Sequence, residues 1–448
     1  MKKNDIFEIE ITGITDEGHG IGRAEGIVVF VPYALKGEVV RVIIIKLLKS
    51  YAIGKILDIV HPCRMRIKSE CEYFYRCGGC SFQNVDYEEE LEYKHRFVTD
   101  CIRKLAKSDV EVLPVKGAAE TRFYRNKSQF PVSESGIGIY APKSHRVIDM
   151  DKCLIQSPET EEIIKTVRKW MADFNIAPYN EESDTGCIRH IYTRSGNFET
   201  MVVIVTRMKK LKFSNELVER LKECSGKICS VMQNVNLKRT NVVLGDEMKL
   251  LWGKDYIIDS IGESKFKISP YSFYQVNNAQ TKVLYDTAKA YADVKKTDIV
   301  WDLYCGIGTI GQYAAKDAKK IIGIEIVEAA VKNAEENAKL NGLKNCEYYC
   351  GPAEKTAHKL IKNGDRPNVV FLDPPRKGCD VKLLETVVES GTDKIVYISC
   401  KPSTLARDLL YLKENGYSIN KIQPTDLFPR TPHIECCVQL CRTQHSSI

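Results

Sequence analysis

The sequence has no apolar run that approaches the roughly 18 residues needed to span a membrane. Its first residues, MKKNDIFEIEIT, also lack the apolar core of a secretory signal. Charge of one sign is not in large excess, since a formal net charge of +7 permits a nucleic-acid partner without requiring one. These absences predict a cytoplasmic protein with no membrane partner.

Cysteine, by contrast, is abundant. Seventeen cysteines in a chain without a secretory signal argue against a disulfide framework and for metal-binding or catalytic thiols. The hydrophobic content of 44% and charged content of 28% are ordinary for a soluble globular protein. A chain of 448 residues is too long for one core and suggests roughly two to four domains.

Residues 1–60 alternate short apolar runs with glycines, which predicts several strands in a small closed barrel. Four basic side chains would give this barrel a basic surface: Arg23, Lys46, Lys49 and Lys55. The segments GHGIGR, VFVPYALKGE and KLLKSYAIGK resemble the TRAM domain, an OB-like RNA-binding barrel.

Residues 61–265 are expected to form an α+β central domain that begins with a cysteine group. Cys71, Cys77 and Cys80 lie within ten residues, and two of them flank a Gly-Gly pair, as expected for ligands that converge on one metal centre. Cys153 is the better candidate for a fourth ligand, because Cys101 falls on the apolar stripe of an amphipathic helix. Four thiolates suit either zinc or an iron–sulfur cluster.

The amphipathic helix, about 87–107, is expected to pack on the catalytic domain through a stripe of Leu91, Val98, Ile102 and Leu105. Further on, basic and aromatic residues are interleaved, a mixture that suits single-stranded RNA, because bases stack and phosphates need positive charge. The residues are Arg122, Phe123, Tyr124, Arg125, Lys127, Phe130, Tyr140, Lys143, His145 and Arg146.

Residues 266–448 show alternating strands and helices, the pattern of an α/β domain. Phe273 to Asn277 open a helix, and IVWDLYCGIGTIG then predicts a strand, a glycine-rich turn and a helix. The next strand ends in Glu325, nineteen residues after Gly306, where an acid can bind ribose hydroxyls. The loop has neither the G-x-G-x-x-G pattern nor a P-loop lysine, which favours S-adenosylmethionine over NAD or ATP.

Two later strands end in reactive side chains. Asp373 is followed by two prolines that stop the strand and hold the carboxylate at the sheet edge. Cys400 ends the run IVYIS, before a helix that Ser403 or Thr404 would cap, and a thiol there can act as a nucleophile if its pKa is lowered. In the last strand, alternation puts Glu435 on the opposite side from Ile434 and Cys436. Asp426, His433 and Glu435 are candidates for a proton-handling group near Cys400.

DLYCGIGTIG, DPPRKG, ISCKPSTLARD and PRTPHIE together resemble the S-adenosylmethionine-dependent RNA uracil C5-methyltransferases. The barrel and cysteine group make the chain most similar to the 23S rRNA branch, with a tRNA enzyme of the same mechanism as the alternative. The resemblance implies a Rossmann-like class I methyltransferase domain over 266–448 and a [4Fe–4S] cluster on Cys71, Cys77, Cys80 and Cys153. It implies cofactor binding by Gln275, Tyr304, Glu325 and Asp373, with Cys400 as nucleophile and Glu435 as base.

The chain departs from that family's pattern at three positions: Tyr304, Pro352 and Lys401. Pro352 removes one adenine contact, and we hypothesise that Lys401 helps to hold Cys400 as a thiolate.

Two other functions compete: an amino-group methyltransferase, which needs neither Cys400 nor Glu435, and a non-catalytic, cluster-bearing RNA-binding protein, which needs no intact cofactor site. We expect a monomer.

Overall fold

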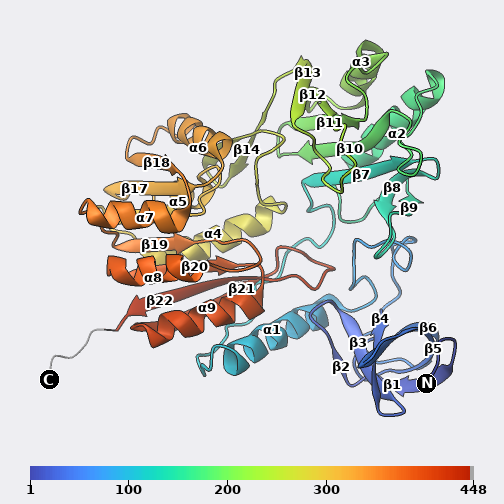
Figure 1. Cartoon of the computed structure of the whole chain (residues 1–448), viewed down its shortest axis with the longest axis horizontal. Helices are drawn as coiled ribbons and strands as arrows, with labels where there is room; N and C mark the ends of the chain where they lie inside the picture. The colour runs from blue at the N-terminus through green and yellow to red at the C-terminus, as the bar shows by residue number, and fades with distance from the viewer. Residues whose placement is uncertain (444–448) are drawn as a thin grey trace.

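The computed structural model describes residues 1–443, which form a barrel, a central α+β part and a large α/β part (Figure 1). The strands of the first part are β1 (Ile6–Glu10), β2 (Gly13–Ile14), β3 (His19–Ala24), β4 (Ile27–Pro32), β5 (Val39–Leu47) and β6 (Tyr51–His61). They pair in the order β1-β5-β6-β4-β3-β2. Because the Thr12 N–H, just after β1, donates to Ile21 O on β3 at 2.8 Å, the sheet curls back on itself around a core that includes Val29 and Val42. The predicted barrel is confirmed, and its four basic side chains are exposed.

The central sheet has helices on one face and the α/β part on the other. Its order is β13-β12-β11-β10-β7-β8-β9. The elements are β7 (Lys127–Ser133), β8 (Gly136–Tyr140), β9 (Val147–Asp149), α2 (Glu159–Asp173), β10 (Ile188–Ser195), β11 (Thr200–Thr206), α3 (Ser214–Cys224), β12 (Ile228–Val235) and β13 (Glu247–Gly253). Trp170 of α2 and Leu221 of α3 share a core with Val202, whereas Val203, the next residue of β11, packs with the α/β part. Because successive side chains of a strand point to opposite faces, one sheet contributes both to the core of the central part and to the core of the α/β part.

The hairpin of β14 (Ile257–Ile261) and β15 (Ser264–Ile268) leads into a doubly wound sheet of order β18-β17-β16-β19-β20-β22-β21. Its strands are β16 (Ile299–Leu303), β17 (Lys320–Glu325), β18 (Cys346–Cys350), β19 (Val369–Leu372), β20 (Lys394–Ser399), β21 (Tyr417–Thr425) and β22 (Glu435–Arg442). The pairings from β18 through to β20 are parallel, and β22 is antiparallel to both of its neighbours. Strand order reverses beside β16, and that reversal point is where open α/β sheets bind ligands.

Helices cover both faces of this sheet. They are α4 (Asn278–Ala292), α5 (Thr309–Ala314), α6 (Glu328–Leu340), α7 (Ala353–Lys362), α8 (Val381–Ser390) and α9 (Pro402–Glu414). One face packs on α7, α8 and α9, and the other on α4 and α5. The Rossmann-like prediction is therefore confirmed. Within residues 1–443 no helix has the length and apolar character to cross a membrane.

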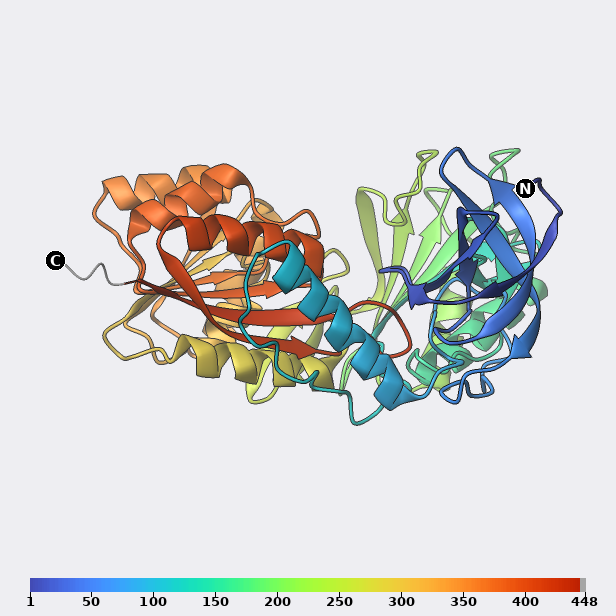
Figure 2. The same ribbon diagram turned by 90° about the horizontal axis from the view of Figure 1, so that it is seen from below.

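Helix α1 (Tyr87–Lys104) belongs to the N-terminal half of the chain but packs on the α/β part, beside α9 (Figure 2). Val98, Cys101 and Ile102 join the core that α7, α8 and α9 cover, so Cys101 has the packing role expected of it. Leu105 follows the last helical residue and is 46% exposed, so its assignment to the buried stripe was wrong.

A buried ion-pair network fixes α1 to the loop between β21 and β22. Lys94 Nζ lies 2.7 Å from Glu90 Oε1 and 2.8 Å from Asp426 Oδ1, and all three side chains are buried. The Tyr87 hydroxyl donates to Asp426 Oδ2 at 2.9 Å, so both oxygens of this carboxylate are engaged. Asp426 therefore has a structural position, and the expectation that it handles protons near Cys400 is not supported by its contacts.

Replacing Lys94 with methionine should destabilise the protein strongly. The substitution keeps the aliphatic stem but leaves the buried Asp426 carboxylate without its cation, and Glu90 with only Arg430 at 3.8 Å, and breaking a buried pair typically costs about 3–5 kcal/mol. Chemical denaturation of the full chain measures the free energy of unfolding. Lys104→Met is the matched control, because Lys104 pairs with Asp100 at the exposed end of the same helix and should contribute less than about 1 kcal/mol. Equal losses for the two variants would contradict a special role for the buried network.

Candidate active site

The loop after β16 has the backbone of a ligand-binding turn. Tyr304, Gly306 and Gly308 have φ values of 66°, 56° and 81°, all in the left-handed region. Tyr304 carries a Cβ, so its backbone is strained, and such strain is typical of functional loops. A Cβ on Gly308 would lie 2.5 Å from Gln312 Nε2, whereas one on Gly306 would meet nothing within 4 Å. The loop therefore packs tightly against α5 and is open on the side of Gly306.

Glu325 is held next to this loop at the end of β17. Its carboxylate accepts hydrogen bonds from the backbone N–H groups of Gly306 at 3.2 Å, Ile326 at 2.8 Å and Val327 at 2.9 Å. Ile326 is 66% exposed, which leaves an apolar surface beside the acid. Glu325 thus lies between the open glycine turn and an exposed aliphatic side chain. This arrangement fits an adenosine-containing ligand, whose ribose can bind the acid.

Asp302 is a site residue that the sequence reasoning missed. It is the last-but-one residue of β16, and one of its oxygens, Oδ2, accepts from the Gly311 N–H at 2.9 Å. Its other oxygen is buried and has no hydrogen-bond partner among residues 1–443, and burial raises the pKa of the carboxyl to about 7. A buried polar atom without a partner indicates a missing ligand or water. The signal in the sequence was an acid inside an otherwise apolar strand.

Gln275 lies in the loop that leads into α4. It is buried, and its carbonyl accepts a hydrogen bond from Asn126 Nδ2 at 3.0 Å, which connects the loop to the central part. The helix begins at Asn278 and is capped by Asn277, so the expectation that residues from Phe273 onward are helical was wrong. Tyr285 of α4 is hydrogen-bonded to Thr309, the first residue of α5, at 2.9 Å, which fixes α4 next to the glycine loop.

Cys400 and Glu435 meet at one edge of the sheet. The register pairs Ser399 with Cys436, so Cys400 directly follows β20 opposite Glu435, the first residue of β22. Asp373 follows β19, the other neighbour of β20, and brings a second carboxylate to the same edge. Three residues far apart in the sequence therefore converge because their strands are adjacent.

The charges at this edge favour protonated forms. Burial, Glu435 and Asp373 raise the pKa of the Cys400 thiol to about 11, while the positive charge of Arg376 opposes that shift. Burial and Asp373 raise the pKa of Glu435 well above its ordinary value. Burial and Asp302 raise the pKa of Asp373 to about 7. In the RNA-free protein at neutral pH, Cys400 is therefore a thiol.

Arg376 is a second residue that the sequence reasoning passed over, although it completes the Asp-Pro-Pro-Arg segment. Its positive charge lowers the pKa of the Cys400 thiol, and its Nη2 lies 3.3 Å from His433 Nε2. Partial desolvation and Arg376 lower the pKa of His433 to about 4, so this imidazole is neutral. Arg376 is thus the cation that favours a thiolate at position 400.

Lys401 forms an ion pair with another part of the chain, and its hypothesised role at Cys400 stays a prediction. Its Nζ lies 2.8 Å from Asp16 Oδ2 in the barrel, and the cation that most lowers the pKa of Cys400 is Arg376. Lys401 is also the N-cap residue of α9, with Pro402 in the first turn. Neither Ser403 nor Thr404 is the cap, and the Thr404 hydroxyl donates to the carbonyls of Lys401 and Arg376.

Alkylation of Cys400 should therefore be slow at neutral pH and should accelerate with pH. Only the thiolate reacts with iodoacetamide, and below a pKa of about 11 its fraction rises about tenfold per pH unit. Mass spectrometry of the Cys400 peptide at pH values of about 7 to 9 measures the rate. A rate independent of pH over this range would show that Cys400 is already ionised.

The four predicted cluster cysteines lie near one another. Cys71, Cys77 and Cys153 pack against the same core, and burial, with smaller effects of Cys153 and the other two thiols, raises the pKa of Cys80. Two sulfurs accept hydrogen bonds, Cys77 Sγ from the Gly79 N–H at 3.3 Å and Cys80 Sγ from Gln83 Nε2 at 3.7 Å. Within residues 1–443, however, no group of three or more His, Cys, Asp or Glu side chains is arranged to hold a metal ion. A thiolate-bound centre on these four cysteines therefore stays a prediction.

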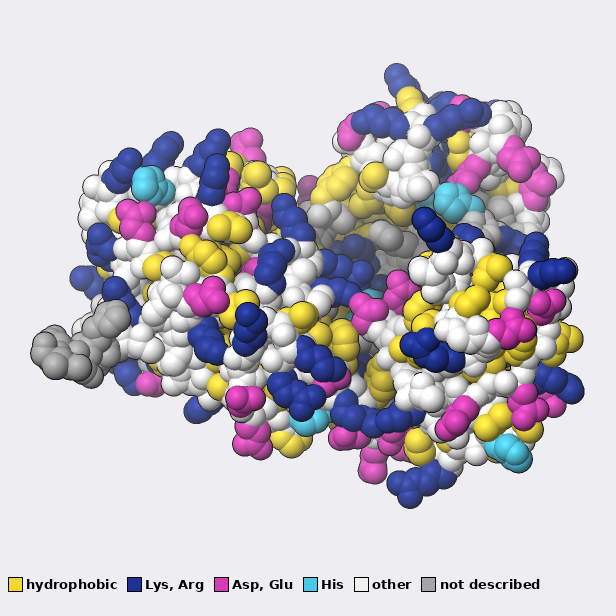
Figure 3. All heavy atoms as spheres, turned by 60° about the horizontal axis from the view of Figure 1, so that its bottom comes forward, with side chains coloured by type: hydrophobic (Ala, Val, Ile, Leu, Met, Phe, Trp, Pro, Cys, Tyr) yellow, Lys and Arg dark blue, Asp and Glu magenta, His cyan; other side chains and the backbone are white. Residues whose placement is uncertain are grey.

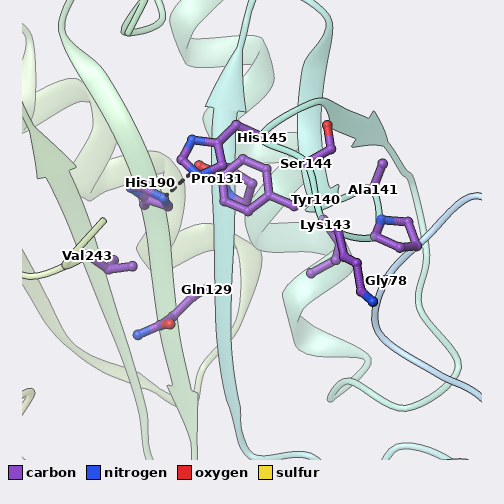
Figure 4. A pocket seen from close by; sticks show the side chains of 12 residues that line it. Gly78, Gln129, Pro131, Tyr140, Ala141, Lys143, Ser144, His145, His190 and Val243 are labelled. Carbon is purple, nitrogen blue, oxygen red and sulfur yellow. Dashed lines mark hydrogen bonds between the residues drawn. The ribbon is translucent and has the colours of Figure 1, made fainter. Parts of the chain in front are cut away.

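The interleaved basic and aromatic residues of the central part do not all lie on one surface. Phe130 is 1% exposed and belongs to the core, so its assignment to RNA stacking was wrong. Tyr140, Lys143 and His145 instead line a cavity of about 560 Å³ beside β8 (Figure 4). Figure 3 also shows a hollow between the α/β part and the rest of the molecule, with Lys and Arg side chains inside it.

A doubly wound sheet of this order, with a glycine loop and an acid at the ends of adjacent strands, is the fold of a class I methyltransferase. The family model described as "tRNA (Uracil-5-)-methyltransferase" matches residues 86–443, and the "TRAM domain" model matches residues 2–57. The chain belongs to this family of RNA uracil C5-methyltransferases.

Its relatives agree with that assignment. A protein of Clostridium tetani named "Uncharacterized RNA methyltransferase" is 44% identical, with 98% of this chain and 96% of the relative covered. A protein of Halalkalibacterium halodurans with the same description is 43% identical, with coverage of 97% and 96%. The crystal structure of Pyrococcus abyssi tRNA (uracil-54, C5)-methyltransferase with S-adenosyl-L-homocysteine has a TM-score of 0.80 and 27% identity, covering 97% of this chain and 99% of that one.

Proposed function

We propose that this protein transfers a methyl group from S-adenosylmethionine to C5 of a uridine in RNA, through a covalent bond between Cys400 and C6 of the base. The observation that carries the proposal is the placement of Cys400 opposite Glu435, on the sheet edge that also holds Asp373 and Arg376. An amino-group methyltransferase has no use for this thiol and acid.

S-adenosylmethionine would supply an electrophilic methyl group when bound. Glu325 would bind the ribose hydroxyls, and the exposed side chain of Ile326 would cover the adenine. The unpartnered oxygen of Asp302 would receive a polar group of the ligand. Gln275, Tyr304 and Asp373 complete the set implied by the family resemblance. The crystal structure of the 27% identical relative contains S-adenosyl-L-homocysteine, which supports this choice of cofactor.

The reaction needs a nucleophile because C5 of uracil is too weak to attack the methyl group unaided. The target uridine must first leave any stack to enter the site. The Cys400 thiol gives up its proton to solvent, its Sγ adds to C6, and the ring becomes an enolate. C5 of this enolate would form a bond to the methyl carbon as the bond from that carbon to the sulfonium sulfur breaks, with S-adenosylhomocysteine as the leaving group. Arg376 favours the thiolate that this addition requires, against the burial that favours the thiol.

Glu435 then removes the proton from C5, and the electron pair of that C–H bond restores the ring double bond as the bond from C6 to Cys400 breaks. A raised pKa makes the ionised carboxylate a stronger base, which suits this role. All these residues come from one chain, in keeping with a monomer.

We propose 23S rRNA as the substrate, because the TRAM domain and the cysteine group accompany that branch of the resemblance. tRNA is the second candidate, since the structurally similar Pyrococcus abyssi enzyme acts on tRNA. Mass-spectrometric mapping of 5-methyluridine in rRNA and tRNA from a strain lacking the gene decides between them. Loss of 5-methyluridine from neither RNA would refute the proposed function.

We further propose that Cys71, Cys77, Cys80 and Cys153 hold a [4Fe–4S] cluster that braces the central part against RNA. Protein purified without oxygen should contain about four iron atoms and as much sulfide, and zinc without iron would contradict this. Cys153→Ser should lose the metal and much of the soluble protein, because a lost ligand removes folding energy tied to the site. Cys224→Ser is the control, since Cys224 packs on the same core outside the group.

A further inference from the structure

The cavity of about 560 Å³ lies where several segments of the chain meet. It is walled by β7, β8 and β10 of the central sheet, by the turn that follows β8, by Val243, and by Gly78 of the cysteine loop. The Gly78 N–H donates to Tyr140 O at 3.1 Å, and a Cβ on Gly78 would come within 3.1 Å of the same oxygen. This close approach makes the cysteine loop part of the cavity wall. Pockets that bind small ligands have volumes of about 300–1,000 Å³, so the space is large enough for a nucleotide.

Two stacked rings form a platform in this cavity (Figure 4). The Tyr140 and His145 ring centroids are 5.2 Å apart, and the ring planes are inclined by 24°. The His145 side chain is 53% exposed, so the stack can be extended by another flat ring. Aromatic side chains of this kind hold unpaired bases, because every base has a face that can stack.

Polar groups surround the platform. His190 Nε2 lies 3.5 Å from the Tyr140 hydroxyl, and His190 Nδ1 is buried with no hydrogen-bond partner in the described part of the chain. Gln129 adds an amide with both a donor and an acceptor, as the edge of a base requires. Lys143 supplies the positive charge, and its closest acid is Glu17 of the barrel, at 3.9 Å.

We infer that this cavity binds a second unpaired nucleotide of the RNA, at a site separate from the one that holds the target uridine. The base stacks on Tyr140 and His145, its edge contacts Gln129, and its phosphate contacts Lys143. The ion pair of Lys143 with Glu17 places the cavity beside the TRAM barrel, so RNA held by the barrel is close enough to enter it. The inference rests on the proposed RNA substrate and adds a contact that selects the RNA without taking part in the chemistry.

Steady-state methylation of total RNA from a strain lacking the gene tests this site. Tyr140→Ala should raise KM about tenfold and leave kcat unchanged, as expected for the loss of one base-stacking contact. Tyr140→Phe keeps the ring and should stay within about twofold of the unaltered protein. Phe198→Ala is the matched control, because Phe198 is a 71% exposed aromatic residue of the same central part outside the cavity. His145→Ala should raise KM severalfold, and it replaces Tyr140→Ala as the deciding variant if that protein does not fold.

Crosslinking separates this inference from the proposed function. RNA that contains 4-thiouridine, irradiated with the full protein, should crosslink to the peptide with Tyr140 and His145, whether or not methyl transfer occurs. If the unaltered protein methylates RNA but both alanine variants keep its KM and the peptide stays free of crosslinks, the nucleotide site is refuted and the proposed function stands. If the crosslink forms without any methylation, the site stands and the proposed function fails.

Discussion

Cys400→Ala should lower methyl transfer by more than about a thousandfold, because the substitution removes the only atom proposed to attack C6 of the uridine. Binding of S-adenosylmethionine should persist, since Asp302, Glu325 and the glycine loop lie at the ends of β16 and β17 and, within residues 1–443, form their hydrogen bonds with groups other than the thiol. Transfer of labelled methyl groups to RNA measures the first quantity, and calorimetric titration with the cofactor measures the second.

The matched control is Cys350→Ala. Cys350 is the last residue of β18, at the same edge of the sheet as Cys400, but it is exposed and belongs to the outermost strand. This variant should keep its full activity. Substantial turnover by Cys400→Ala would rule out the covalent mechanism, whereas loss of both activity and cofactor binding would indicate a structural role for the thiol.

Glu435→Gln should stop the reaction after methyl transfer. The adduct between Cys400 and C6 cannot collapse until the C5 proton leaves, and glutamine keeps the shape of the side chain while losing its basicity. We therefore expect a protein–RNA band that survives heat and denaturing electrophoresis and carries label from the methyl group. Release of methylated RNA should slow strongly, by about a hundredfold or more, which is the typical contribution of a general base.

The double variant Cys400→Ala/Glu435→Gln provides the control, because it should form no band. Normal turnover by Glu435→Gln would show that another group is the base. His433 would then be tested next, since it lies beside Arg376 and is neutral, whereas both oxygens of Asp426 already have partners.

Local patterns were sufficient to predict the strand ends. Glu325 and Cys400 each stand at the end of a run rich in β-branched residues. In a parallel sheet the carboxyl ends of such runs lie at one edge, so their position does not depend on contacts elsewhere in the chain. The alternation in β22 likewise predicted that Glu435 and Cys436 face opposite sides, and the structure puts Cys436 and Cys437 in different cores.

Contacts between distant segments could not be predicted in this way. Nothing near Lys401 in the sequence indicates that Asp16 would bind it, and nothing near Arg376 indicates that its guanidinium would reach Cys400. The sequence likewise could not predict that one oxygen of Asp302 is buried without a hydrogen-bond partner among residues 1–443, because a strand pattern does not indicate which polar atoms form hydrogen bonds. Charge placement depends on the packing of whole domains, and that information is spread over the full chain.

The position of α1 has a consequence for how this protein is made and how it could be divided. The helix leaves the ribosome long before α9 and β22, so Val98 and Ile102 have no surface to cover until the last strands are complete. A fragment that starts after the central sheet would lack this helix, and Asp426 would lose its buried cation. The α/β part is therefore not expected to fold correctly when it is expressed without α1. If the RNA-binding parts of two relatives are exchanged, α1 should be kept together with the α/β part on which it packs.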